Sequence, residues 1–405
     1  MNFKLTNCCF KSRRTIGSLR FLFTRNCLME KAAVDKHKMK GWQIHSYGTL
    51  NELQFSDKLR IPIIRCPNEV LVKVTSAGVN PIDVSMVGGY GSKLINILRC
   101  NREGIEFPLT FGREFTGVIA QKGMGICKDL QVGDEVWGVV PIQRQGSHSE
   151  YTVVPDFCLS RKPVNLNHIE AGCLLYAGLT AWSGLFISGQ LGGVAGALNC
   201  GNTCSQSNTK KVLVLGASGG VGSIAIQILR AENSTVIATC STDAIPLVKN
   251  LGAQHVIDYS DQTQLKQLAD FSPYDIILDC AGLGPKYAGH FDWQFKSFVT
   301  FSSPLLKNVD ESGIGLGMLK NFIELIESNS KTLSLRQGCV KWGYFVPAPQ
   351  GIEYLKKLIE RKKLLPQIDS TFNFENTKEA YEKVSHGHLR GKVVIDFINE
   401  KKNSQ

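Results

Sequence analysis

The sequence lacks three features that would place the chain in common classes of protein. No apolar run reaches the length of a membrane span, since the most apolar stretch, residues 213–229, is broken by glycines. The thirteen cysteines include no C-x-x-C pair, so no zinc ribbon or thioredoxin-like pair is indicated. Basic and aromatic residues are not interleaved, so the net charge of +11 does not indicate nucleic-acid binding.

Acidic residues are absent from the first 29 residues, which carry six Lys or Arg. Phe10, Ile16, Leu19 and Phe23 can form one apolar face of a helix in this stretch. An Arg-rich, acid-free and amphipathic composition is typical of a mitochondrial targeting segment. We therefore predict that residues 1–38 target the chain to the mitochondrion, with the matrix as destination; a disordered basic tail is the alternative.

Residues 211–229 read KVLVLGASGGVGSIAIQIL and carry the clearest chemical signal. A buried strand ends at a glycine cluster, and an apolar helix follows at once. The amides and dipole of such a helix N-terminus favour a pyrophosphate, and glycines let the backbone approach it. The spacing is G-x-x-G-x-x-G, with Ser218 where the strict dinucleotide motif has its second glycine.

Four further β-rich runs follow, at residues 235–240, 255–259, 274–279 and 297–301, with helix-compatible segments between them. This alternation predicts a doubly wound parallel sheet. An NAD site would place Asp or Glu near the tip of the second strand, where this chain has Ser241 and Thr242. Hydroxyl groups favour NADPH there, although no Lys or Arg is adjacent and Asp243 could swing in.

Six short motifs in order resemble the zinc-free quinone oxidoreductase branch of the medium-chain dehydrogenase/reductase superfamily. They are VNPID at residues 79–83, FPLTFGRE at 107–114, VGDEV at 132–136, AGLTAW at 177–182, the glycine loop, and GHLRGK at 387–392. The resemblance implies an α/β protein: a GroES-like β-rich catalytic domain plus a Rossmann-type nucleotide domain. We expect residues 39–165 and 346–405 to form the first and residues 166–345 the second, with a loop insertion at 192–209.

Zinc-using members of this superfamily hold their catalytic ion with a Cys and with the His of a Gly-His-Glu motif. Here these positions read Asn80-Pro81 and Gly112-Arg113-Glu114, and an arginine cannot ligate a cation. We therefore expect no metal site. Without a Lewis acid, reduction of an already electrophilic acceptor is favoured over alcohol oxidation.

The resemblance also implies a set of residues around the coenzyme and the acceptor. Asn80 and Asp83 begin a loop in the cleft, where Asp83 has capping of a helix as its alternative role. Tyr90 is the candidate proton donor or oxyanion partner, with water as the alternative donor. His148 is expected to be structural. The expected coenzyme-binding residues are Ser218, Gly219, Gly220, Val221, Ser241, Tyr259, Cys280, Thr300, Phe345, Gly387, His388 and Arg390.

The function that follows is transfer of hydride from NADPH to a small-molecule quinone or another activated carbonyl acceptor, linked by resemblance to ubiquinone metabolism. An enoyl-thioester reductase is the nearest alternative. A second alternative is an NADPH-binding scaffold with little turnover, for which the resemblance implies a reticulon-type protein partner. The Gly/Asn/Ser-rich insertion at 192–209 would then be a docking loop.

Overall fold

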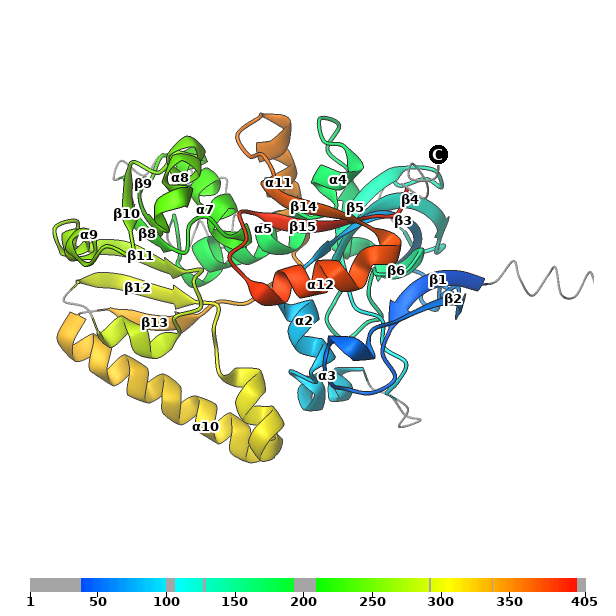
Figure 1. Cartoon of the computed structure of the whole chain (residues 1–405), viewed down its shortest axis with the longest axis horizontal. Coiled ribbons are helices and arrows are strands. Elements are labelled where there is room, and N and C mark those ends of the chain that lie inside the picture. Colours follow the sequence, from blue (N-terminus) through cyan, green and yellow to red (C-terminus); the bar gives the residue numbers. More distant parts are fainter. Residues whose placement is uncertain are drawn as a thin grey trace, which may run out of the picture.

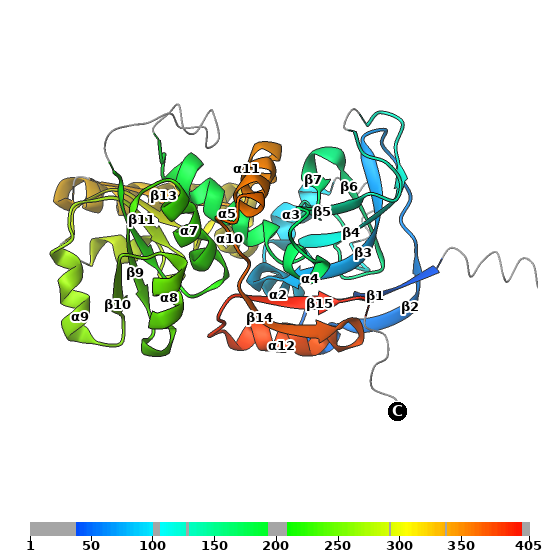
Figure 2. The ribbon, with the colours of Figure 1, turned by 90° about the horizontal axis from the view of Figure 1, so that it is seen from above.

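The structure is a computed structural model that describes residues 38–99, 106–126, 129–192, 209–290, 293–336 and 338–398. Two bodies, each built on one main β-sheet, lie side by side (Figures 1 and 2). The predicted targeting segment, apart from Lys38, lies outside the described residues. So does the predicted insertion between Gly192 and Thr209, including Cys200 and Cys204.

The mixed-sheet domain contains a seven-stranded sheet in the order β14-β15-β3-β4-β5-β7, with β6 also paired to β3. Strand β15 pairs antiparallel with β3, which places Val393 opposite Val79. The end of the chain therefore completes the domain that its beginning starts. The strands are β3 (Glu69–Val79), β4 (Glu114–Lys122), β5 (Glu135–Val139), β6 (Tyr151–Pro155), β7 (Leu159–Arg161), β14 (Ile368–Asn373) and β15 (Lys392–Asp396), with a separate pair β1 (Lys38–Gln43) and β2 (Gln54–Arg60).

The parallel-sheet domain contains six strands in the order β10-β9-β8-β11-β12-β13. Most are apolar and buried on both faces, as expected where helices cover both sides of a parallel sheet. Its order reverses beside β8, at the start of the glycine loop, where such folds bind ligands. The strands are β8 (Lys211–Leu215), β9 (Thr235–Cys240), β10 (His255–Asp258), β11 (Tyr274–Asp279), β12 (Phe295–Thr300) and β13 (Cys339–Trp342).

Helices fill the space around and between the two sheets. Helix α10 runs along the lower side of the molecule in Figure 1, and α3 lies beside its first turns. The helices are α2 (Pro81–Val87), α3 (Ser92–Leu98), α4 (His168–Ala171), α5 (Leu175–Trp182), α7 (Gly220–Ala231), α8 (Ile245–Leu251), α9 (Gln262–Lys266), α10 (Leu305–Arg336), α11 (Pro349–Glu360) and α12 (Thr377–His386).

The predicted fold class is confirmed, and the differences concern particular elements. Strand β13 was not expected; it is short, and only Val340 is fully buried in it. Helix α11 ends at Glu360, and two residues later Lys362 adopts a left-handed conformation with φ of 57°. Helix α7 begins at Gly220, so Gly220 and Gly222 lie in its first turn, whereas Gly216 and Gly219 precede it.

The two domains share one continuous hydrophobic core. Helices α5 and α11 meet in it, with Trp182 and Leu355 both buried. The contact is close, since a Cβ at Gly351 would lie 2.6 Å from Leu179 Cδ2 and 3.0 Å from the Trp182 ring. By length and composition, the described stretch His168–Ser188 would suit a membrane span, but 83% of its apolar window is buried. It is therefore a core element.

We predict that Gly222→Ala destabilises the fold by about 1–3 kcal/mol, because the added Cβ collides with backbone that cannot move aside. It would meet the carbonyl oxygen of Gly216 and lie 2.8 Å from Ala217 Cα. Gly219→Ala is the matched control, since its Cβ has a nearest neighbour at 3.6 Å. Urea unfolding followed by circular dichroism measures both changes, and equal stability of the two variants would contradict the prediction.

Candidate active-site cleft

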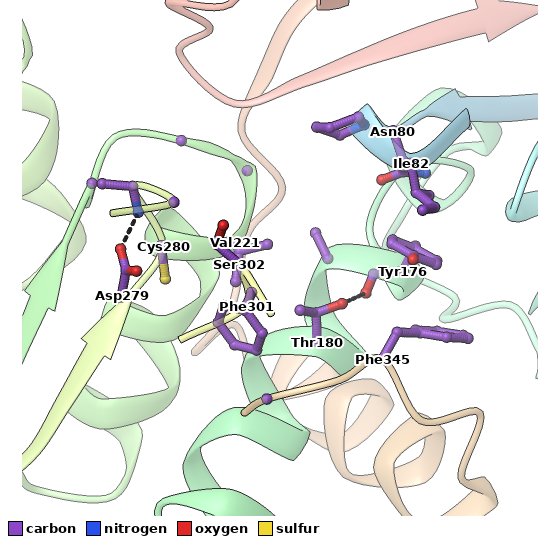
Figure 3. A pocket seen from close by; sticks show the side chains of 18 of the residues that line it. Asn80, Ile82, Tyr176, Thr180, Val221, Asp279, Cys280, Phe301, Ser302 and Phe345 are labelled. Atoms are coloured by element: carbon purple, nitrogen blue, oxygen red, sulfur yellow. Dashed lines mark hydrogen bonds between the residues drawn. The ribbon is translucent and has the colours of Figure 1, made fainter. Parts of the chain in front are cut away.

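A cavity of about 1330 Å³ lies between the two domains. Its volume is larger than that of a typical site for one drug-sized ligand, about 300–1000 Å³, so it has room for more than one such ligand. Figure 3 shows Val221, Asp279 and Cys280 on one side of it and Asn80, Ile82 and Tyr176 on the other. The cavity therefore faces both sheets.

The glycine loop forms one wall of the cavity through Ser218, Gly219, Gly220 and Val221, four of the predicted coenzyme-binding residues. Gly219 caps α7 with no side-chain hydrogen bond, so the first amides of a twelve-residue helix have no capping side chain. Gly216 has a φ of +73°, and a Cβ there would lie 2.9 Å from Ala281 Cα. This open helix N-terminus with a bare backbone fits a diphosphate group.

The tip of β9 carries a small charged network. Arg390, from the loop before β15, donates to the Ser241 hydroxyl at 2.9 Å and pairs with Asp243 at 2.7 Å. Hydrogen bonds from Ser241 and then from Arg390 hold the pKa of Asp243 below its usual range. No Lys or Arg is adjacent to Ser241 in the sequence, but the fold brings Arg390 beside it. Arg390 and Tyr259 line the cavity. Ser241 does not line it, and its hydroxyl donates to Asp243.

The end of β11 shapes the middle of the cavity. Asp279 accepts hydrogen bonds from the amides of Ala281, Leu283 and Gly284 at 2.9–3.1 Å and so folds the loop that carries Cys280. Cys280 lines the cavity, and burial, with the Asp279 charge, raises the pKa of its thiol well above the usual value. Thr300 does not line the cavity: it is fully buried and donates to Asp279 at 2.7 Å. Its predicted coenzyme contact is replaced by support of this loop.

Two later segments also line the cavity and carry predicted coenzyme-binding residues. Gly387 and His388, both with positive φ, turn the chain from α12 toward β15 and line the cavity. Phe345 stacks on Tyr176 with ring centroids 4.3 Å apart. Tyr176 was not predicted to line the cavity, although it immediately precedes the AGLTAW motif.

Tyr90 lines the far end of the cavity on the loop between α2 and α3. Burial raises the pKa of its phenol above the usual value, and the Asp310 carboxylate and Tyr344 add to the effect. The loop is held from the other domain, because Asp310 of α10 accepts from the amides of Gly91 at 2.6 Å and Lys93 at 3.2 Å. Tyr90 is therefore a neutral hydrogen-bond donor near neutral pH.

Asn80 also lines the cavity, and its side chain is fully engaged. Its amide donates to Glu114 at 2.9 Å, and its carbonyl oxygen accepts from the ammonium group of Lys392. Lys392 pairs with Glu114 at 3.0 Å in a buried position. The charge of Lys392 is therefore directed to Asn80 and Glu114.

Asp83 does not line the cavity, which corrects its expected catalytic position. It is fully buried and accepts from the amides of Asn80 at 2.9 Å and Gly112 at 3.0 Å. It thereby caps α2 and lies 3.6 Å from Arg113 Nε. His148 is buried as well, and it hydrogen-bonds Tyr381 at 2.8 Å, in agreement with a structural role.

Arg113 lies at the position where zinc-using members have a histidine ligand, and its contacts are structural. The Arg113 guanidinium donates to the carbonyl oxygens of Pro141, Ile142 and Arg144 at 2.9–3.2 Å. In the described part of the chain, no group of three or more His, Cys, Asp or Glu side chains could hold a metal ion.

A glycine turn at the sheet's switch point, facing a second β-rich domain across a cleft, defines a nucleotide-dependent oxidoreductase of the medium-chain dehydrogenase/reductase superfamily. Family comparisons agree: the alcohol dehydrogenase GroES-like domain matches residues 66–164, and a zinc-binding dehydrogenase family matches residues 251–395. The quinone oxidoreductase of Coxiella burnetii has the same fold, with a TM-score of 0.68 at 24% identity over 89% of this chain and 99% of that one.

Full-length relatives narrow the assignment. The Drosophila melanogaster protein named NAD(P)H oxidoreductase RTN4IP1, mitochondrial, is 51% identical over 365 residues, which cover 90% of this chain and 87% of that protein. A Caenorhabditis elegans protein named reticulon-4-interacting protein 1, mitochondrial, is 33% identical over 371 residues, which cover 89% and 95%. The chain therefore belongs to this family of mitochondrial NAD(P)H oxidoreductases.

We predict that Asp83→Ala lowers the free energy of unfolding by about 3–5 kcal/mol, because it removes the buried partner of Arg113. Two buried backbone amides lose their acceptor in the same change. Asp57→Ala, at an exposed position in β2, is the control. Urea unfolding measures both, and an Asp83→Ala protein that keeps its stability but loses turnover would show a catalytic role instead.

Proposed function

We propose that the protein transfers hydride from NADPH to a quinone-type acceptor in the mitochondrial matrix, without zinc and in connection with ubiquinone metabolism. The observation that carries the proposal is one continuous cavity. It extends from an arginine and the open end of α7 to an apolar region beside Tyr90. When bound, the coenzyme supplies the hydride; the chain supplies position, exclusion of water and a proton.

Arg390 supports a preference for NADPH. Its guanidinium reaches the hydroxyl of Ser241 at the tip of β9, where a 2′-phosphate on the adenosine ribose would need a positive charge. Asp243 now neutralises that charge at 2.7 Å, so the carboxylate opposes the phosphate and Arg390 favours it. The balance between the two side chains then sets the preference between coenzymes.

The other end of the cavity supports an apolar, electrophilic acceptor. Its lining there includes Ile82, Leu94, Leu98 and Leu306. Arg113 stands where a zinc ligand would be, so the acceptor receives no help from a metal at this position. A quinone accepts hydride without such activation, and the neutral Tyr90 phenol can donate to its developing oxyanion.

A protein partner of the reticulon type is a separate proposal, which rests on the name of the Caenorhabditis elegans relative. The predicted docking loop at 192–209 is its candidate site. Deleting that loop should abolish partner capture and leave coenzyme binding unchanged.

The acceptor is tested by steady-state turnover with NADPH and either a short-chain ubiquinone or a 2-enoyl-CoA, side by side. We expect ubiquinone reduction at the higher kcat/KM. Preferred reduction of the 2-enoyl-CoA would establish the enoyl-thioester reductase instead. Coenzyme binding with reduction of neither acceptor would favour the scaffold function.

We predict that Arg390→Gln weakens binding of NADPH about tenfold or more and leaves binding of NADH nearly unchanged, because a charge-assisted hydrogen bond is lost. Asp243→Asn should act in the opposite direction and tighten NADPH binding, since Arg390 is then no longer neutralised. Fluorescence titration of each variant with both coenzymes measures the effect. A natural preference for NADH would contradict this assignment.

We predict that Tyr90→Phe lowers kcat for quinone reduction about 10²-fold while the Kd of NADPH stays unchanged. Because burial raises the pKa of Tyr90, the donating neutral form persists with rising pH and is lost only above about pH 10. Turnover of the natural protein should therefore stay level through neutral pH and fall only in the alkaline range. An unchanged kcat in the variant would assign the proton to water.

A further inference from the structure

Helix α10 has the reverse of the usual amphipathic pattern. After a break at Gly313, where φ is 76°, the side chains turned toward the protein body are polar. Asn321 and Thr332 are 3% and 2% exposed. The outward face is apolar and 45–64% exposed at Ile314, Leu319, Phe322, Ile323, Ile326 and Leu333. A soluble protein normally turns such a face inward, so an apolar surface of this extent marks an interaction site.

The polar face of α10 explains how the helix is held without burying its apolar face. Within α10, Asn308 donates to Asn321 at 2.9 Å and so joins the parts before and after the break at Gly313. Asn329 donates to the carbonyl oxygen of Val340 at 3.1 Å and accepts from its amide at 2.9 Å. These bonds also occupy the outer edge of the sheet at β13, so that edge is not free at Val340 to pair with a strand of a second copy.

The apolar face of α10 continues to the mouth of the cavity. Asp310 joins α10 to the start of α3, and at the other end of α3 Ile97 and Leu98 are 52% and 53% exposed. Leu98 and Leu306, the second residue of α10, also line the cavity. In Figure 1, α10 and α3 occupy the same lower side of the molecule. An apolar molecule can thus pass from this surface into the cavity over apolar side chains.

We propose that the outer face of α10, with the end of α3, inserts shallowly into a lipid bilayer, from which a membrane-dissolved acceptor enters the cavity. This rests on the proposed quinone-type acceptor, which partitions into lipid. Charged residues beside the face pair with each other, as in Lys331–Glu327 at 2.9 Å and Lys307–Glu311 at 3.9 Å. Burial of apolar side chains, rather than attraction to anionic headgroups, therefore drives binding.

The test is flotation of the protein, as purified from mitochondria, with phosphatidylcholine vesicles with and without cardiolipin. The variant combines Leu319→Ser, Phe322→Ser and Ile326→Ser, all at exposed positions. The control combines Ile63→Ser, Val132→Ser and Val164→Ser, which are 70%, 61% and 90% exposed on the mixed-sheet domain. We expect the α10 variant to bind vesicles about tenfold more weakly than the natural protein, or more weakly than that. The control variant should bind them as the natural protein does. Added salt should have little effect.

A second measurement separates docking from catalysis. Reduction of a water-soluble short-chain quinone should be equal in all three proteins, whereas reduction of a long-chain quinone held in vesicles should fall in the α10 variant alone. Equal vesicle binding by the variant and the natural protein would overturn docking. So would a dimer in sedimentation that the variant dissociates, since a second copy would then cover the face. Normal vesicle binding without reduction of any quinone would leave docking intact and refute the proposed acceptor.

Discussion

The buried carboxylate of Glu114 joins three segments whose residues line the cavity. One of its oxygens receives the amide of Asn80 and the ammonium of Lys392, and the other receives the backbone amide of Tyr176. These donors come from the loop before α2, from β15 and from the start of α5. A buried carboxylate that accepts from three donors is compensated, whereas removal of one donor leaves a buried charge that lowers the stability of the fold. These contacts hold Asn80, Tyr176 and Lys392, which all line the cavity, in fixed positions.

Lys392 extends this network to the parallel-sheet domain. A Cβ placed on Gly220 would lie 2.9 Å from Lys392 Cδ, so the stem of the lysine packs directly against the glycine loop. The residue that pairs with Glu114 in the mixed-sheet domain thus also touches the glycine loop of the parallel-sheet domain. A bulkier residue at position 220 would disturb both ends of the site through this one side chain.

The sequence was sufficient where structure and chemistry are local. Residues 211–229 contain strand, turn and helix in one run, and alternation of strands and helices predicted the parallel sheet. Contacts made by the returning chain were out of reach, because Arg390 lies 149 positions from Ser241 and joins it only when β15 pairs with β3. The role of a residue within its motif could not be predicted either. Asp83 and Thr300 lie in the segments that the sequence indicated, but both side chains are buried outside the cavity and support neighbouring loops.

The carboxylate of Asp310 belongs to the parallel-sheet domain, yet it holds the amides of Gly91 and Lys93 in the other. If the two halves part to let a product leave, these bonds break and the Tyr90 loop is released in the same motion. Release of the product and release of the Tyr90 loop are then a single event. The rate of that event would set an upper limit on how often the site can be reused.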